Sequence, residues 1–398
     1  MKRRSMKSAQ NLKRNVLQNF ADCCYEVNVL QRNFVMNKPK VLMAMSGGVD
    51  STTAALLLQE AGYDIVGVTL KMFDAKEIGL AAQDDSSFAN VADAAKAAAK
   101  LGFPHHVFDF CKYFRADVID HFIAEYEKGR TPNPCVDCNK HVKLGQLFAR
   151  AEELGCDYIA TGHYANVKFE EESGRWLLLR GEDRQKDQSY MLYTLKQEQL
   201  AHILFPLGHL RKTEIRKKAA AEGLQNAQKP DSQDICFVPD GDYAQVIQNI
   251  TKRKPKSGQF IHLDGTVLGA HKGQLHYTIG QRKGLGIAYR YPLYVISKDI
   301  EKNIVYLGPQ EALFANTLIA ENCNLISVAE LNGPLRVTAK PRYRAADVPA
   351  VIEPLGEGRI RVTFEEPQRA LTPGQAVVFY QGEVVVGGGT IGFVQKAV

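Results

Sequence analysis

Hydrophobic residues in the first half of the chain gather in short runs, which alternate with longer stretches that carry an apolar stripe at helical spacing. Short apolar runs bounded by glycine predict buried strands, and stripes that end at a glycine predict helices. The predicted strands are 40–45, 64–73, 105–110 and 157–165, and the predicted helices are 51–62, 91–102, 112–129 and 139–155. This alternation predicts a doubly wound parallel α/β sheet, whose ligands lie beyond the carboxyl ends of the strands.

The pattern changes in the last part of the chain, where β-branched runs of strand length follow one another and turn sequences separate several of them. That pattern predicts an all-β, barrel-like domain, and a glycine- and lysine-rich connector precedes it. We therefore predict four parts: a basic disordered extension, an α/β domain, a small connector domain and a C-terminal β-barrel domain. Their predicted boundaries are 1–37, 38–215, 216–288 and 289–398.

The composition is that of an ordinary globular protein of 398 residues, with 45% hydrophobic and 24% charged residues. No apolar run is long enough to span a membrane. Eight cysteines without an apolar signal segment favour the reducing cytoplasm, so the thiols are expected to be free, metal-bound or catalytic. The net charge of +6 permits a nucleic-acid partner without requiring one, and the basic extension leaves a targeting role open.

The strongest motif is SGGVDS at 46–51, between the first predicted strand and the first predicted helix. Its two glycines allow a tight turn whose N–H groups, with the helix N-terminus behind them, form a cradle for an anion. The serine hydroxyls can contact phosphate oxygens, and Asp50 can hold Mg²⁺. The motif lacks the lysine of a Walker A loop, and it also lacks the glycine spacing of a dinucleotide fingerprint.

Cys135 and Cys138 form a C-x-x-C motif directly before the predicted helix 139–155. Such a pair can be half of a zinc site, a redox pair, or a nucleophile with a neighbour. Zinc would need two further ligands, and the sequence holds no second C-x-x-C or suitably spaced histidine pair. Cys138 would lie at the N-terminus of the predicted helix, where positive potential lowers the pKa of a thiol and favours a nucleophilic thiolate.

The loop at 46–51 resembles the PP-loop of the ATP pyrophosphatases, which cleave ATP between the α and β phosphates and adenylate an oxygen of their substrate. Several further stretches resemble the tRNA-specific 2-thiouridylases within this class: GRTPNPCVDCNK, KDQSYML, PDSQDICF, HYTIGQRKGLGI and TPGQAVVFYQGEVVVGGG. The resemblance covers about residues 38–398. It implies ATP-dependent 2-thiolation of the wobble uridine, position 34, of the tRNAs for Lys, Glu and Gln.

Two alternatives to this function stay open on the sequence alone. The first is another PP-loop enzyme, an amidating or ligating synthetase that uses ATP without sulfur. The second is an RNA-binding module with no catalytic activity, which would explain the β domain but not the phosphate loop or the separated thiols.

The resemblance also implies roles for individual residues of this sequence. Cys138 would be the nucleophile and Cys236 the persulfide carrier, and the two would form a transient disulfide during turnover. ATP, with Mg²⁺ near Asp50, would be bound by Ala44, Met45, Ser46, Gly47, Gly48, Val49, Asp50, Ser51, Leu70 and Gly162. The target base would contact Asn133, Pro134 and Cys135, and the rest of the tRNA would contact Lys186, Asp187, Gln188, Arg342 and Tyr343.

The implied partners are tRNA and a cysteine desulfurase or sulfur-relay protein. We expect a monomer without a metal site of its own beyond the Mg²⁺ that accompanies ATP. The sequence departs from the family at two places. Many relatives have aspartate where Cys135 stands, and a C-C-S stretch of many relatives is SSF at 86–88 here, so any role of those thiols does not transfer.

Overall fold

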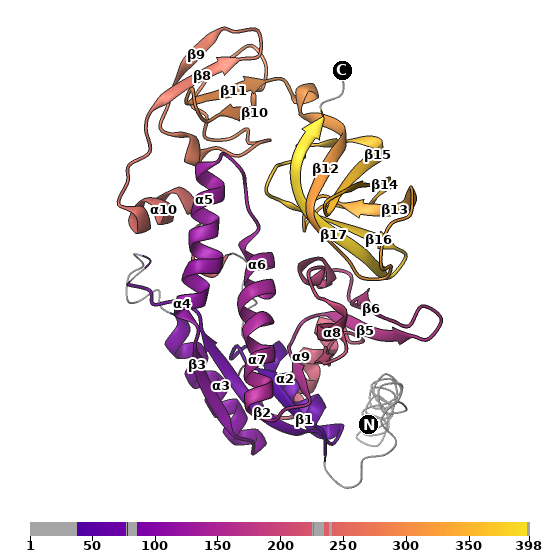
Figure 1. The fold of residues 1–398 in the computed structure, drawn as a ribbon. Helices are drawn as coiled ribbons and strands as arrows, with labels where there is room; N and C mark the ends of the chain where they lie inside the picture. The colour runs from indigo at the N-terminus through magenta and orange to yellow at the C-terminus, as the bar shows by residue number, and fades with distance from the viewer. Residues whose placement is uncertain are drawn as a thin grey trace, which may run out of the picture.

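The computed structural model describes residues 38–76, 78, 86–224, 226, 235–238 and 241–395. The predicted basic extension, 1–37, lies outside the described residues. Within the described part the strands form a five-stranded, a four-stranded and an eight-stranded sheet. Figure 1 shows the helices gathered around the five-stranded sheet, with the other two sheets beyond one end of it.

The five-stranded sheet is parallel throughout, in the order β3-β2-β1-β4-β7. Its strands are β1 (Lys40–Ala44), β2 (Asp64–Lys71), β3 (His105–Asp109), β4 (Tyr158–Ala160) and β7 (Ile203–Leu204). The central strand β1 is apolar and buried because helices cover both faces of the sheet. The predicted doubly wound α/β domain is therefore confirmed. The predicted strand 157–165 ends early, at Ala160, and its last residue begins a strand of another sheet.

Helices connect these strands and cover the sheet. They are α2 (Val49–Glu60), α3 (Ser86–Leu101), α4 (Cys111–Phe114), η2 (Arg115–Asp120), α5 (His121–Glu127), α6 (Pro134–Asp137), η3 (Cys138–Lys143), α7 (Gly145–Glu153), η4 (Ser189–Leu192), α8 (Gln197–Leu200) and α9 (Lys212–Ala221). The segments α4, η2 and α5 form one continuous helix with a π-helical middle, as predicted for 112–129. In Figure 1 this helix runs from the parallel sheet to the four-stranded sheet.

A middle domain follows helix α10 (Tyr243–Thr251), and its sheet has the order β10-β11-β8-β9. Its elements are β8 (Gly258–His262), β9 (Val267–His271), η5 (Gln274–His276), β10 (Tyr294–Asp299) and β11 (Ile304–Gly308). The predicted boundary at residue 289 assigned β10 and β11 to the C-terminal domain. That assignment is wrong, because β11 pairs along its length with β8 and β10 pairs with β11.

The C-terminal strands close into a barrel, because β12 pairs with β15 on one side and with β17 on the other. After η6 (Gln310–Leu313) come β12 (Phe314–Leu325), β13 (Leu335–Lys340), β14 (Val348–Gly356), β15 (Arg359–Arg369), β16 (Ala376–Gln381) and β17 (Val384–Gln395). The hairpin of β5 (Ala165–Glu170) and β6 (Arg175–Arg180) leaves the α/β domain and pairs with β17. The predicted barrel is confirmed.

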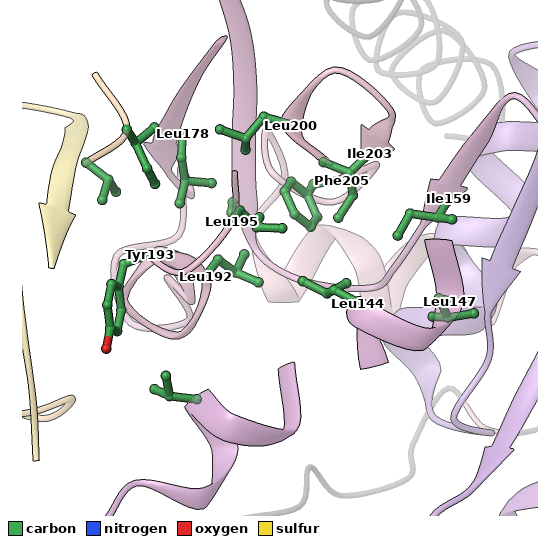
Figure 2. Packing of buried hydrophobic residues seen from close by; sticks show 14 of the residues in the cluster. Leu144, Leu147, Ile159, Leu178, Leu192, Tyr193, Leu195, Leu200, Ile203 and Phe205 are labelled. Carbon is green, nitrogen blue, oxygen red and sulfur yellow. The ribbon is translucent and has the colours of Figure 1, made fainter. Parts of the chain in front are cut away.

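A shared apolar core joins the α/β domain to the barrel. Leu144 and Ile159 of the α/β domain belong to the same buried cluster as Val378 and Tyr380 of the barrel. Figure 2 shows Leu192, Leu195 and Phe205 filling the space between the parallel sheet and the barrel side of this cluster. Each fully buried side chain of this size contributes about 1.5–3 kcal/mol of transfer free energy. The two domains are therefore packed together rather than linked by a free tether.

No helix in the part of the chain that the structure describes combines the length and the hydropathy needed to cross a bilayer.

Candidate active site

The phosphate loop follows β1 directly and ends in the first turn of α2, whose N-cap is Gly48. The amide of Ser46 donates to the hydroxyl of Ser51 at 3.1 Å, and the two hydroxyl oxygens lie 3.2 Å apart. These bonds fold the loop back over the helix N-terminus. The first N–H groups of a helix have no acceptor inside the helix, so the loop aims several donors at one point. The arrangement fits an anion such as a phosphate.

Two glycines permit this turn. Gly47 has a φ of +71°, and a Cβ there would collide with the backbone carbonyl of Asn90. Gly162 lies directly against the loop, since a Cβ on it would come within 2.9 Å of the Ser51 nitrogen. Ala44 is the last residue of β1 and Met45 follows it beside β2, where the hydroxyl of Thr69 donates to the Met45 carbonyl at 2.8 Å. The predicted nucleotide residues therefore meet at the carboxyl edge of the parallel sheet.

Asp50 is held by two side chains from distant parts of the chain. The Lys212 ammonium contacts both carboxylate oxygens of Asp50, at 2.8 and 2.7 Å, and the Tyr164 hydroxyl donates to Oδ1 at 2.7 Å. Asn226 also reaches the loop and donates to the carbonyls of Gly47 and Gly48 at 3.2 and 3.1 Å. Asp50 is therefore engaged within the protein, and binding Mg²⁺ through it would require Lys212 to move away.

The helix that carries the two cysteines begins earlier than predicted. It starts at Pro134 instead of Asn139, continues through the π-helical turn η3 and runs on as α7. Cys135, which the prediction placed before the helix, therefore lies in the first helical turn, whereas Cys138 lies one turn further in and is buried. The expected helix N-terminal position of Cys138 is wrong. Proline suits the first position of a helix because its missing N–H is not needed there.

Burial raises the pKa of the Cys138 thiol to about 11, the opposite of the expected effect. Burial also raises the pKa of Cys236 to about 12, with a further increase from the charge of Cys138. Lys143 acts in the other direction and lowers the pKa of both thiols. Cys138 and Cys236 thus lie in one electrostatic cluster, together with Cys135 and Lys143. The residues Cys135 and Cys236 are accessible to solvent, while protein packed around their sulfur atoms still disfavours the charged form.

Lys143 stands at the other end of η3 from Cys138. Burial alone would lower its pKa, but the negative potential of Cys138, Cys135 and Cys236 outweighs burial and raises it. A π-helical turn changes which side chains share a helix face, and such turns occur often at functional sites. Lys143 is therefore the cation that stabilises a thiolate in this cluster.

Cys236 is held in place by its neighbour Phe237. The Phe237 ring is buried and packs edge-on against Phe114 and Phe122 of the long α4–η2–α5 helix, at centroid distances of 5.7 and 5.3 Å. Phe237 and Cys138 belong to the same buried cluster. This anchoring brings the segment 235–238 to the C-x-x-C helix, although the two are far apart in sequence.

His163 connects the phosphate loop to the thiol cluster. It follows Gly162, and its Nδ1 lies 2.7 Å from the Thr161 hydroxyl oxygen. Burial, with a smaller effect of Lys143, lowers the pKa of His163 to about 3, so the imidazole is neutral at physiological pH. His163 therefore follows the glycine that lies against the loop, and it is within electrostatic reach of Lys143.

The three residues of the segment 186–188 differ in burial and in contacts. Asp187 is buried and accepts bonds from the amides of Gly181 and Ser189 at 3.1 and 3.0 Å, while Arg180 lies 3.6 Å away. These contacts make Asp187 a structural residue, and the predicted direct contact of its side chain with tRNA has no support in this geometry. Lys186 and Gln188 are half-buried, and Gln188 accepts a bond from the Tyr164 amide at 3.1 Å.

The barrel reaches this segment through Tyr343, whose hydroxyl donates to the Asp187 carbonyl at 3.3 Å. Tyr343 also lies near Cys135, whose charge contributes to raising the pKa of this tyrosine after burial and Asp187. Arg342 is exposed and donates to the Arg369 carbonyl at 2.8 Å. The two segments predicted to contact tRNA therefore lie side by side, next to the C-x-x-C helix.

Asn133 and Pro134 lie at the start of that helix. Asn133 is half-buried and its amide points at the Met191 sulfur at 3.9 Å, and Pro134 is buried. Among the described residues, no group of three or more His, Cys, Asp or Glu side chains has the geometry to hold a metal ion.

Three polar side chains of the site carry no recognisable signal in the sequence: Lys143, Lys212 and Asn226. None of them belongs to a motif with a mechanism that can be recognised from spacing. A buried lysine is visible only once the fold brings it to its partners.

Comparison with known proteins supports the architecture domain by domain. Residues 39–240 match the family described as tRNA methyl transferase HUP domain, residues 245–309 its PRC-barrel domain, and residues 315–391 the aminomethyltransferase beta-barrel domain. The chain is 52% identical over 356 residues to tRNA-specific 2-thiouridylase MnmA of Moorella thermoacetica, which covers 88% of this chain and 98% of that protein. This chain belongs to the tRNA-specific 2-thiouridylase family.

Two further members of the 2-thiouridylase family align over the same extent. The MnmA 1 protein of Thermoanaerobacter pseudethanolicus is 49% identical over 354 residues, which is 88% of this chain and 97% of the relative. The MnmA protein of Acetivibrio thermocellus is 48% identical over 358 residues, which is 89% of this chain and 100% of the relative. All three domains of the 2-thiouridylase fold are thus present in this chain.

Proposed function

We propose that this protein catalyses ATP-dependent 2-thiolation of the wobble uridine, position 34, in the tRNAs for Lys, Glu and Gln. The observation that carries the proposal is the meeting of Cys138 and Cys236 in one cluster with Lys143, beside a phosphate loop. A thiol–disulfide step requires two thiols that can approach each other, and this fold provides them from separate segments.

ATP binds, in this proposal, at the loop 44–51, with Leu70 and Gly162 completing the pocket. The loop amides and the N-terminus of α2 hold the phosphates. The uracil C2 oxygen attacks the α-phosphorus, and pyrophosphate leaves with the electron pair of the broken P–O bond. The poor leaving group at C2 becomes AMP, so a sulfur nucleophile can replace it. Mg²⁺ bound to the triphosphate would lie near Asp50.

Sulfur arrives as a persulfide on Cys236, supplied by a cysteine desulfurase or a sulfur-relay protein. The thiolate of Cys138 attacks the inner sulfur of Cys236 and releases the outer sulfur as hydrosulfide, which displaces AMP from C2. The transferred sulfur gains two electrons, and the two cysteines lose them as they form the Cys138–Cys236 disulfide. A thiol reductant then restores both cysteines.

The tRNA is bound, in this proposal, across the C-x-x-C helix and the barrel. Asn133, Pro134 and Cys135 contact the target base, and Lys186, Gln188, Arg342 and Tyr343 contact the surrounding nucleotides. Asp187 supports this surface from behind through its backbone and side-chain bonds. Exposed Arg342 can contact a phosphate, which fixes the orientation of the tRNA without reading its sequence.

The test is a reconstituted reaction with the full chain, ATP, a tRNA transcript with uridine at position 34, cysteine and a cysteine desulfurase. Mass spectrometry should detect 2-thiouridine at position 34, and a transcript with cytidine at this position should remain unmodified. Ser51→Ala should lose AMP formation while its tRNA affinity changes little, because the proposed tRNA contacts lie in other segments. Formation of an amide or a ligated product without sulfur would instead identify an amidating synthetase.

A further inference from the structure

The pair formed by Lys212 and Asp50 joins the phosphate loop to a helix far away in the sequence. Lys212 is the first residue of α9, and its backbone amide donates to Asp183 Oδ2 at 3.0 Å, which fixes the start of that helix. Its side chain is 10% exposed and lies across α2, where the ammonium contacts both oxygens of Asp50. The phosphate loop 46–51 contains no lysine of its own, and Lys212 brings an ammonium to it from a distant helix.

The position of this pair matters because Asp50 lies in the first turn of α2, beside the N–H groups that form the anion cradle. A carboxylate there repels an incoming polyphosphate, while an ammonium attracts it. A buried ammonium needs a negative partner, since an unpaired charge in the protein interior is strongly destabilising. Asp50 is such a partner when the loop is empty, and a phosphate oxygen can take its place when the loop is filled.

We propose that Lys212 is a phosphate-binding residue that exchanges Asp50 for the β- and γ-phosphates of ATP, and then holds the pyrophosphate as it leaves. This inference rests on the proposed use of ATP. The exchange replaces the ion pair between Lys212 and Asp50 by two favourable contacts. Lys212 then contacts the phosphates, and the released Asp50 carboxylate faces the Mg²⁺ that accompanies the triphosphate. When the bond between the α-phosphorus and its bridging oxygen breaks, the charge that develops on pyrophosphate is next to the Lys212 ammonium.

A matched control exists on the same two helices. Lys218 of α9 contacts both carboxylate oxygens of Glu60 on α2, at 2.9 and 2.7 Å, at the end of α2 that is far from the loop. Lys218→Met therefore removes a comparable ion pair between α2 and α9 without touching the phosphate cradle. Any loss of ligand affinity caused only by loosened helix packing should appear in this variant as well.

The experiment is calorimetric titration of the full chain, in the presence of Mg²⁺, with three probes: pyrophosphate, α,β-methylene-ATP and AMP. Lys212→Met should weaken binding of pyrophosphate and of α,β-methylene-ATP by about tenfold to a hundredfold, as expected for a lost hydrogen bond to a charged group. AMP, which has only the α-phosphate, should bind as it does to the unmodified protein. Lys218→Met should change none of the three affinities appreciably.

The double variant Asp50→Asn/Lys212→Met leaves no unpaired charge, so it keeps the test valid if the single variant folds poorly. Compared with Asp50→Asn alone, the double variant should bind pyrophosphate about tenfold to a hundredfold more weakly, because the two proteins differ only in the Lys212 ammonium. Equal pyrophosphate affinities for the Lys212→Met, Lys218→Met and unmodified proteins would overturn the role of Lys212. A failure of the unmodified protein to bind α,β-methylene-ATP would instead contradict the proposed use of ATP itself.

Discussion

Cys236 lies within electrostatic reach of Cys138, although the two cysteines belong to segments separated by β4, the β5–β6 hairpin and α9. This proximity follows from Phe237, which anchors one segment to the long α4–η2–α5 helix, and from the π-helical turn that begins at Cys138. Both thiols resist ionisation because they are surrounded by protein. Both thiols are therefore protonated at neutral pH, even though Lys143 lowers their pKa values.

The first prediction concerns Lys143. Since Lys143 lowers the pKa of Cys138, Lys143→Met should raise that pKa and shift the pH profile of Cys138 alkylation to higher pH. Alkylation proceeds through the thiolate, so its rate at a fixed pH below the pKa falls about tenfold for each unit of increase in pKa. Lys143→Arg should keep most of the reactivity. The measurement is the rate of iodoacetamide labelling of Cys138 between pH 7 and 10, followed by peptide mass spectrometry.

Lys140 supplies the control, because it is an exposed lysine in the same π-helical turn. Unlike Lys143, it is not among the charges that shift the pKa values of Cys135, Cys138 and Cys236. Lys140→Met should leave the alkylation profile unchanged. An unchanged profile in Lys143→Met as well would show that Lys143 does not stabilise the thiolate.

The second prediction concerns Arg180, which is buried between the α/β domain and the barrel. Its guanidinium pairs with Asp187 and Asp347 and lies 3.5 Å from the centre of the Tyr380 ring. Arg180→Met leaves two carboxylates without their partner, so it should lower the free energy of unfolding by roughly 3–5 kcal/mol. Urea denaturation of the purified variants measures this loss.

The exposed pair Arg184–Glu383 joins the same two domains and provides the comparison. Arg184→Met should cost less than about 1 kcal/mol, as exposed ion pairs usually do. Equal losses for Arg180→Met and Arg184→Met would contradict the role of Arg180 as the buried link between the domains.

The third prediction concerns Arg342 at the tRNA surface. Arg342→Ala should weaken tRNA binding and reduce the slope of log affinity against log salt by about one, because one phosphate contact is lost. The measurement is tRNA affinity by filter binding at several salt concentrations. An affinity and a salt slope equal to those of the unmodified protein would remove Arg342 from the interface.

The fourth prediction separates Cys135 from the other two thiols. Cys135 is accessible and lies next to Tyr343 of the barrel, which suits a contact with the target base. Cys135→Ser should keep a substantial part of 2-thiouridine formation, whereas Cys138→Ser and Cys236→Ser should each abolish it. Quantifying 2-thiouridine in the reconstituted reaction distinguishes these cases. Complete loss of 2-thiouridine in Cys135→Ser would show that Cys135 takes part in sulfur transfer.

Local patterns predicted most of the α/β domain because each element is encoded within its own segment. The run KVLMA forms the buried strand β1, and the Ala-rich stretch before Gly102 forms α3. Strand pairing is different, since it depends on contacts between distant segments. The β-branched runs of β10 and β11 look alike in sequence to those of the barrel, yet they pair with β8 in the middle domain.

The main error in the candidate site came from the start of the cysteine helix. Pro134 after Asn133 is a sequence signal for a helix beginning, but proline also suits an extended loop, and the sequence alone did not separate the two. Because the helix starts at Pro134, Cys138 lies one turn inside it, where the π-helical turn begins. Its high pKa could not be predicted, because burial depends on Phe237 and other residues that only the fold brings together.

The most direct test of the account is peptide mapping after a single turnover. The protein, loaded with persulfide on Cys236, is mixed with ATP and uridine-34 tRNA in the absence of reductant, then quenched with an alkylating reagent and digested. A disulfide that joins the Cys138 and Cys236 peptides, in an amount equal to the 2-thiouridine formed, is the predicted result. A Cys135–Cys138 disulfide, or 2-thiouridine formed while the Cys138 thiol stays free, would contradict the account.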